Sequence, residues 1–106
     1  MRYNEAAFIG QKRSKEAQLK LFDYTGFAML TYTIKKGESD NGFMPVGEEL
    51  LAAKMVYDSQ MIIYLTDEAG FAKAQSKPLT IEEGNRIYTK ILEDGIKEYS
   101  GDIKTI

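Results

Sequence analysis

The chain has 106 residues, of which 43% are hydrophobic and 28% charged, and its formal net charge is −2 at pH 7. These values are typical of a single globular domain over residues 1–106, and they exclude a disordered chain and a dedicated, strongly basic DNA-binding protein. The sequence contains no Cys and no His, which excludes disulfide scaffolds, zinc fingers and any site that depends on a thiol or an imidazole.

Hydropathy gives an expectation about location. No apolar run approaches the roughly 20 residues that a membrane-spanning helix needs, and the first five residues lack the apolar region of a signal peptide. We therefore expect a cytoplasmic protein without a membrane partner.

Charge is uneven along the chain: residues 1–36 hold seven basic and three acidic groups, whereas residues 37–106 hold seven basic and thirteen acidic groups. Opposite charges of this kind attract within one fold or between two copies, so a homodimer is considered.

The N-terminal third gives one clear strand and one ambiguous segment. Residues 14–24 fit a helix capped by Ser14, but the alternation of residues 18–21 fits a strand equally well. Residues 27–34 are rich in aromatic and β-branched side chains, which predicts a strand with Leu30, Tyr32 and Ile34 on one face. A surface loop over 35–42 and a short extended segment over 43–46 follow, and Pro45 should confine that segment to a sheet edge.

The middle of the chain predicts a helix and then a hairpin. Strong helix formers over residues 47–57, with acids in the first turn, favour a buried helix of about ten residues. The continuous apolar run over 60–66 is typical of a central strand covered on both faces. Residues 67–70 turn the chain, and residues 71–75 fit a returning strand, although their alanines also suit a helix. The tail over 98–106 adds a last strand or frays.

The best-defined element is a helix from Pro78 to about Asp94. Thr80, followed three residues later by Glu83, matches a capping box, and Gly95 suits the left-handed position after the last turn. Gly84 lies in the middle of the apolar stripe, where Ala would favour the helix by about 1 kcal/mol. We interpret Gly84 as a point of close packing against a strand or helix, with a ligand or partner at that turn as the alternative.

These elements predict an α+β fold. It consists of a small, mostly antiparallel sheet of three to five strands, the C-terminal helix on one face, and a shorter second helix near residues 48–57.

Motifs for catalysis and for metal or cofactor binding are absent. The loop over 37–42 resembles a calcium loop in composition, but its acids do not have the spacing of an EF-hand. Adjacent acids such as Glu82 and Glu83 point about 100° apart on a helix and do not form an acid–base couple by themselves. No phosphate-binding glycine loop and no nucleophile elbow occurs. We predict no catalytic residue, no metal site and no cofactor.

The leading functional hypothesis is a small non-enzymatic protein that binds another macromolecule, as a regulator, inhibitor or accessory subunit. It depends on seven tyrosines and five methionines in a chain without Trp, because Tyr and Met are favoured at interfaces with partner proteins. The predicted partner-binding residues are Tyr24, Phe27, Tyr32, Tyr57 and Tyr88.

Two alternatives use other residues. A small-molecule-binding protein or a carboxylate-based enzyme requires a tyrosine-lined pocket, with an acid such as Asp58 or Asp67 inside an enzyme's site. A weak nucleic-acid binder would use the basic cluster Lys12, Arg13 and Lys15 for phosphate contact. Basic clusters of this size are usually solvated, so nucleic acid is an unfavoured partner.

Overall fold

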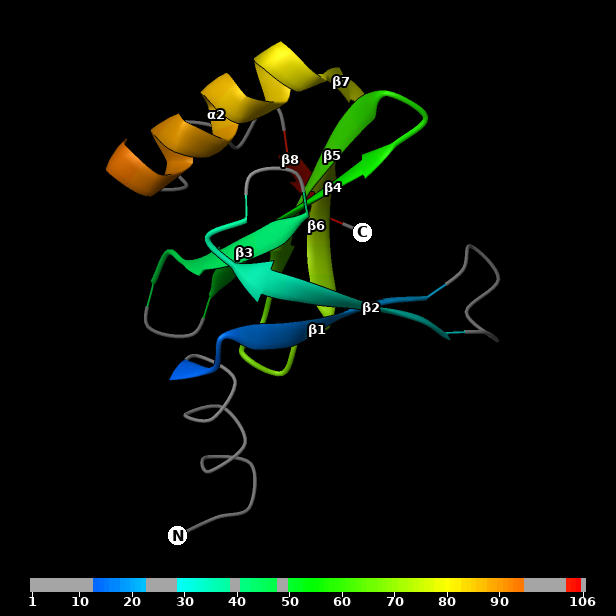
Figure 1. Cartoon of the computed structure of the whole chain (residues 1–106), viewed down its shortest axis with the longest axis vertical. Coiled ribbons are helices and arrows are strands. Elements are labelled where there is room, and N and C mark those ends of the chain that lie inside the picture. Colours follow the sequence, from blue (N-terminus) through cyan, green and yellow to red (C-terminus); the bar gives the residue numbers. More distant parts are fainter. Residues whose placement is uncertain (1–12, 23–28, 39–40, 48–49, 95–102, 106) are drawn as a thin grey trace, which may run out of the picture.

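In the described part of the chain, eight strands form one mixed sheet that curls around a core, and a helix covers its outer face (Figure 1). This computed structural model describes residues 13–22, 29–38, 41–47, 50–94 and 103–105. Helix α2, Ile81–Asp94, packs on the sheet. The order across the sheet is β1-β2-β3-β4-β5-β6-β8, with β7 paired to β5 off this path. The strands are β1 (Glu16–Phe22), β2 (Met29–Lys36), β3 (Gly42–Pro45), β4 (Leu51–Tyr57), β5 (Gln60–Thr66), β6 (Ala72–Ser76), β7 (Leu79–Thr80) and β8 (Ile103–Thr105).

The predicted architecture of three to five strands and two helices is wrong, chiefly because the expected helix near residues 48–57 is strand β4. Its apolar residues run all round because both faces of this strand are covered. Leu51, Ala53 and Met55 pack into the core inside the curl, whereas Ala52 and Val56 pack beneath α2. Asp58 and Ser59, both with positive φ, then close a two-residue hairpin to β5.

Several local predictions are confirmed. The run over 60–66 is strand β5, paired on both sides, and the segment after the 67–70 turn is strand β6. Within the ambiguous segment 14–24, Glu16–Phe22 form strand β1, antiparallel to β2, which is the strand alternative; residues 23 and 24 lie outside the described residues. The prediction that Pro45 confines its segment to a sheet edge is wrong, because strand β3 lies between β2 and β4. Pro45 is tolerated there because it pairs only with Leu51 of β4 and lies beyond the two residues that pair with β2.

Helix α2 begins at Ile81, directly after the predicted N-cap Thr80 but later than the predicted start at Pro78, because Leu79–Thr80 form strand β7; the helix packs closely on β5. The Glu83 N–H donates to the Thr80 hydroxyl oxygen at 3.1 Å, which is the N-cap bond expected from the sequence. Gly84 lies against Met61 of β5, confirming close packing on a strand. The outer core beneath the helix contains Ala52, Met61, Ile63, Leu79, Ile87, Tyr88 and Ile91. Gly95 lies outside the described residues.

The β1–β2 hairpin is joined to the rest of the sheet at only a few points. Strand β2 pairs with β3 in parallel through two residues, Lys35 with Gly42 and Lys36 with Phe43. At the other side of the curl, the Lys20 N–H of β1 donates to the Gly70 carbonyl at 2.8 Å, and Lys20 forms an isolated parallel bridge with Phe71. The sheet therefore curls into an incomplete barrel, in which most of β2 has β1 as its one strand partner among the described residues.

Candidate functional site

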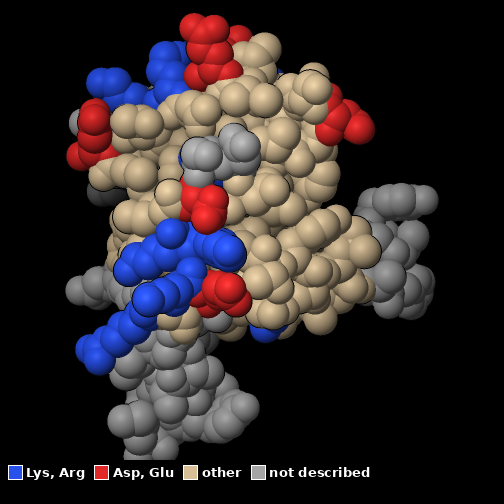
Figure 2. Space-filling view, in the orientation of Figure 1, with Lys and Arg blue, Asp and Glu red and all other residues tan. Residues whose placement is uncertain are grey.

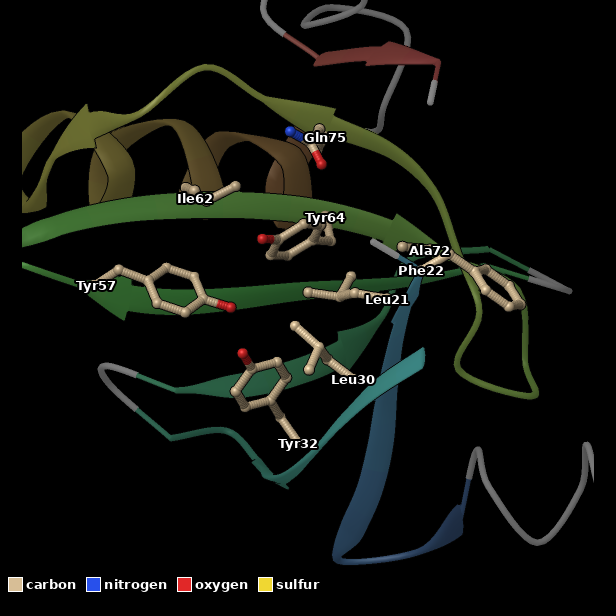
Figure 3. Close-up of a pocket in the computed structure, with 9 residues that line it drawn as sticks. All are labelled: Leu21, Phe22, Leu30, Tyr32, Tyr57, Ile62, Tyr64, Ala72 and Gln75. Carbon is tan, nitrogen blue, oxygen red and sulfur yellow. The ribbon is translucent and has the colours of Figure 1, made fainter. Parts of the chain in front are cut away.

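A cavity of about 410 Å³ lies on the inner face of the curled sheet, between the β1–β2 hairpin and strands β4–β6 (Figure 3). Its floor is the inner core, which includes the buried ring of Tyr64. Nine residues line it: Leu21, Phe22, Leu30, Tyr32, Tyr57, Ile62, Tyr64, Ala72 and Gln75. The volume falls within the range of about 300–1,000 Å³ that is typical of small-molecule sites.

Strand alternation explains why the lining side chains of β2 and of β5 share one face. Successive strand residues point to opposite faces, so Leu30 and Tyr32 both point inward, as do Ile62 and Tyr64. Strand β6 departs from this period at a bulge, where Thr66 pairs with Ala72 but Leu65 pairs with Ala74. The bulge is why Ala72 and Gln75, three residues apart, both line the cavity.

The hydroxyl groups of Tyr32, Tyr57 and Tyr64 converge at one end of the cavity (Figure 3). The rings of Tyr32 and Tyr57 meet edge to face, with centroids 6.1 Å apart. Burial, and then hydrogen bonding with Tyr64 and Tyr32, raises the pKa of the Tyr57 phenol above its ordinary value. Burial also raises the pKa of Tyr64. Both phenols are therefore neutral hydrogen-bonding groups at physiological pH.

The opposite end of the cavity is apolar. Phe22 and Ala72 lie there, away from the tyrosine hydroxyls, and Leu21 and Leu30 lie between the two ends (Figure 3). None of the nine described lining residues carries a charge, and the one amide is that of Gln75. The cavity can thus enclose an apolar body and offer hydrogen bonds at one end, which is the usual composition of a ligand site.

Large apolar side chains are exposed on strands β1 and β2, and two of them, Phe22 and Leu30, line the cavity. Phe22, Met29 and Leu30 are 58%, 48% and 51% exposed. The ring of Phe22 stacks on Phe71, with centroids 6.1 Å apart and an interplanar angle of 13°. The Lys20 ammonium lies 4.7 Å from the centroid of the same Phe71 ring. Phe71 therefore connects the end of the hairpin to strand β6 beside the cavity.

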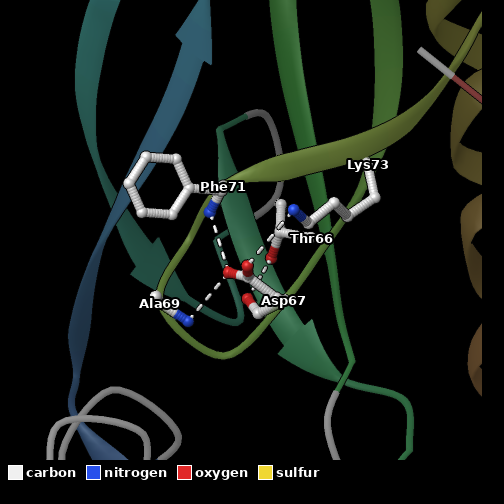
Figure 4. Close-up of polar contacts among 5 residues, drawn as sticks. All are labelled: Thr66, Asp67, Ala69, Phe71 and Lys73. Atoms are coloured by element: carbon white, nitrogen blue, oxygen red, sulfur yellow. Dashed lines mark hydrogen bonds and ion pairs between the residues drawn. The ribbon is translucent and has the colours of Figure 1, made fainter. Parts of the chain in front are cut away.

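The turn before β6 holds Phe71 in place (Figure 4). One carboxylate oxygen of Asp67 accepts hydrogen bonds from the backbone N–H groups of Ala69 and Phe71, each at 3.0 Å. The other lies 3.7 Å from the Lys73 ammonium, and the Thr66 hydroxyl donates to the Asp67 carbonyl at 2.8 Å. This Asx turn fixes the backbone from which the Phe71 ring projects.

The structure brings together two of the five predicted partner-binding residues. Tyr32 and Tyr57 meet in the cavity. Tyr88 lies on the other side of the sheet, in the outer core, where its hydroxyl donates to the Ala52 carbonyl at 3.1 Å. Burial raises the pKa of the Tyr88 phenol as well. Tyr24 and Phe27 lie outside the described residues.

The predicted phosphate-contact residues are placed in part. Lys12 lies outside the described residues, and Arg13 is exposed. Lys15 lies beside the end of β2, where its backbone carbonyl accepts a hydrogen bond from the Lys36 N–H at 2.8 Å. Cross-strand pairing also places Lys35 opposite Glu16. Basic groups gather in this region with acidic groups directly beside them (Figure 2), so the face is mixed in charge.

The acids considered for an enzyme site do not line the cavity. Asp58 is exposed in the β4–β5 turn, and Asp67 is engaged in the turn described above. The described residues contain no group of three or more acids, His or Cys arranged to hold a metal ion. They also contain no helix long and apolar enough to cross a membrane.

Seven of the nine lining residues are not among the predicted site residues: Leu21, Phe22, Leu30, Ile62, Tyr64, Ala72 and Gln75. The sequence predicts a strand over 60–66, and the two-residue spacing of Ile62 and Tyr64 indicates that both share a face. Gln75 carries no such signal, because its orientation depends on the β6 bulge.

No family model, no curated protein and no solved structure matches this chain.

Proposed function

We propose that this chain is a non-enzymatic binding protein that holds a small, largely apolar molecule in the tyrosine-lined cavity. The cavity itself supports this proposal: about 410 Å³ of concave space, with phenol hydroxyls at one end and apolar side chains at the other. The nine described lining residues include no carboxylate, amine or aliphatic hydroxyl to act as acid, base or nucleophile, so binding fits them better than catalysis.

The volume bounds the size of the ligand. An apolar cavity of about 150 Å³ accommodates benzene, so one of about 410 Å³ has room for two to three rings of similar size. A ligand of about 15 non-hydrogen atoms gaining about 0.4 kcal/mol per atom would bind with about −6 kcal/mol. That free energy corresponds to a dissociation constant of tens of micromolar.

The direct test compares two tryptophan substitutions. Ala72→Trp places a large ring inside the cavity, whereas Thr31→Trp adds the same ring at an exposed position beside Leu30 and Tyr32. Binding of 2-(hydroxymethyl)naphthalene is followed by NMR of tyrosine-labelled protein, with circular dichroism to check that both variants fold. We expect Ala72→Trp to weaken binding by at least about tenfold, because the ring occupies the site, and Thr31→Trp to change it less than about twofold. Binding that both variants retain, or no binding to the unsubstituted protein, would overturn the proposal.

The exposed apolar side chains of β1 and β2 favour binding of a partner protein as the second candidate function. Phe22 and Leu30 are exposed lining residues, and Met29 is exposed as the cross-strand partner of Phe22; exposed apolar surface of this kind is often covered by another chain. A second copy of this chain is the partner that purified protein can test. Sedimentation should then give a dimer mass that Met29→Lys halves and that Thr33→Lys, an exposed position on the same strand, leaves unchanged. A monomer mass at high concentration would remove this candidate.

A further inference from the structure

We infer that the ligand of the cavity is uncharged and carries a polar head, such as a hydroxyl or a primary amide, that both donates and accepts hydrogen bonds at Tyr32, Tyr57 and Tyr64. The inference rests on the proposed small-molecule function and adds the chemistry of the ligand. It follows from two observations: the hydroxyls converge at one end of the cavity, and the remaining length is apolar, with Leu21 and Leu30 in the middle and Phe22 and Ala72 at the opposite end (Figure 3).

The arrangement sets the orientation of the ligand. An apolar body gains by leaving water for the apolar end, whereas a polar head placed there would lose its hydrogen bonds without replacement. The head therefore lies against the tyrosine hydroxyls, and the body points toward Phe22 at the opposite end. Because Phe22 is 58% exposed, the far end of the body remains partly in water.

Counting hydrogen-bonding groups defines the head. Each phenol hydroxyl supplies one donor and two accepting lone pairs. Tyr57 forms hydrogen bonds with both Tyr64 and Tyr32, and because each hydroxyl has a single hydrogen, these two bonds use two of the three donors. One donor and most of the lone pairs are left for a ligand. A head with both functions satisfies the hydroxyls, whereas a head that only accepts can engage the single free donor.

Charge is disfavoured in the head. A carboxylate or ammonium would leave water for a space whose nine described lining residues offer no opposite charge, and burying an unpaired ion costs more than one hydrogen bond returns. The Lys20 ammonium does not reach the head position, because it lies over the Phe71 ring outside the lining. Tyr57 and Tyr64 stay neutral at physiological pH, so they do not supply an anion for a cationic head.

Two matched pairs of probes separate head from body. The first pair is 2-naphthamide and 2-naphthoate, and the second is 2-(hydroxymethyl)naphthalene and the ammonium form of 2-(aminomethyl)naphthalene, with 2-methylnaphthalene as the probe that lacks a polar head. Dissociation constants are measured at neutral pH by NMR titration of the full chain. We expect each neutral probe to bind at least about tenfold more tightly than its charged counterpart.

Phenylalanine variants then locate the head. Tyr57→Phe should weaken 2-naphthamide about five- to tenfold, the value of one hydrogen bond, and leave 2-methylnaphthalene within about twofold. Tyr88→Phe is the matched control, because it removes a buried phenol hydroxyl on the other side of the sheet; it should leave both probes unchanged.

The outcomes distinguish the two proposals. If no naphthalene binds, including the one without a polar head, the proposed function fails and the inference fails with it. If the probes bind but a charged probe equals its neutral partner, or Tyr57→Phe weakens all probes equally, the inference alone is overturned.

Discussion

Replacing Gly84 by Ala tests whether α2 and β5 are packed as closely as the structure shows. A Cβ at residue 84 would lie 2.5 Å from the Met61 sulfur, 2.9 Å from its Cβ and 3.0 Å from its Cγ. The Met61 sulfur can swing away, but its Cβ is fixed to the backbone of β5, and the side chain is fully buried. Overpacking of this kind costs about 1–3 kcal/mol, whereas Ala favours the helix by about 1 kcal/mol. We expect Gly84→Ala to lower the free energy of unfolding by about 1 kcal/mol.

The assay is urea denaturation followed by far-UV circular dichroism. With a slope of about 1–1.5 kcal/mol per molar urea, the expected loss lowers the midpoint by about 0.7–1 M. Thr89→Ala is the control, because residue 89 is exposed on the same helix and gains propensity without meeting the sheet; its midpoint should rise slightly. A Gly84→Ala protein that is more stable than the unsubstituted chain would refute the close approach of the helix to Met61.

Two further predictions concern the buried phenols and the turn at Asp67. Burial raises the pKa of the Tyr57, Tyr64 and Tyr88 phenols, so above about pH 10 the folded protein keeps protons that the unfolded chain has lost. The free energy of unfolding is therefore unaffected by these phenols below about pH 10. Above it, the free energy of unfolding falls by about 1.4 kcal/mol per pH unit for each of them. Tyrosinate absorbance and circular dichroism should therefore change together at high pH; all seven tyrosines ionising near pH 10 with the fold intact would contradict this. Asp67→Ala should cost about 1–3 kcal/mol by leaving the Ala69 and Phe71 N–H groups without their acceptor, whereas Asp67→Asn keeps an acceptor and should cost under about 1 kcal/mol. Thermal unfolding compares the two variants, and equal losses would show that the carboxylate charge, rather than the turn, matters.

Local signals in the sequence predicted those elements whose structure depends on neighbouring residues. Thr80 caps α2 because its hydroxyl reaches an N–H three residues away, a distance that the sequence alone specifies. The run over 60–66 is apolar because β5 has covered faces on both sides, and that pattern is as visible in the sequence as in the structure.

Strand β4 shows why the rest could not be predicted. Leu, Ala, Lys and Met all favour helices, and an apolar pattern on every side suits a buried helix as well as a central strand. The choice is made by pairing with β3 on one side and β5 on the other, together with burial against α2. These contacts join residues far apart in sequence, and they outweigh intrinsic propensities of a few tenths of a kcal/mol per residue.

The candidate site divides in the same way. Tyr32 and Tyr57 were named for their residue type, and the structure brings their rings together in the cavity. What the sequence does not contain is the cavity itself. It requires β1 to approach β6 through Lys20 and Phe71, and it requires the β6 bulge that turns Gln75 inward.

The way the sheet closes explains why a cavity lies beside a core. Near the short parallel pairing of β2 with β3, the inner face is filled by buried side chains such as Phe43, Leu19 and Ile34. Toward the free end of the hairpin, β2 has no second strand partner among the described residues, and the space opposite Leu30 stays open. Stability and binding therefore depend on different stretches of the same strands. Because Tyr32 and Tyr57 pack only at the edge of the inner core, losing their hydroxyls should affect ligand affinity more than the free energy of unfolding.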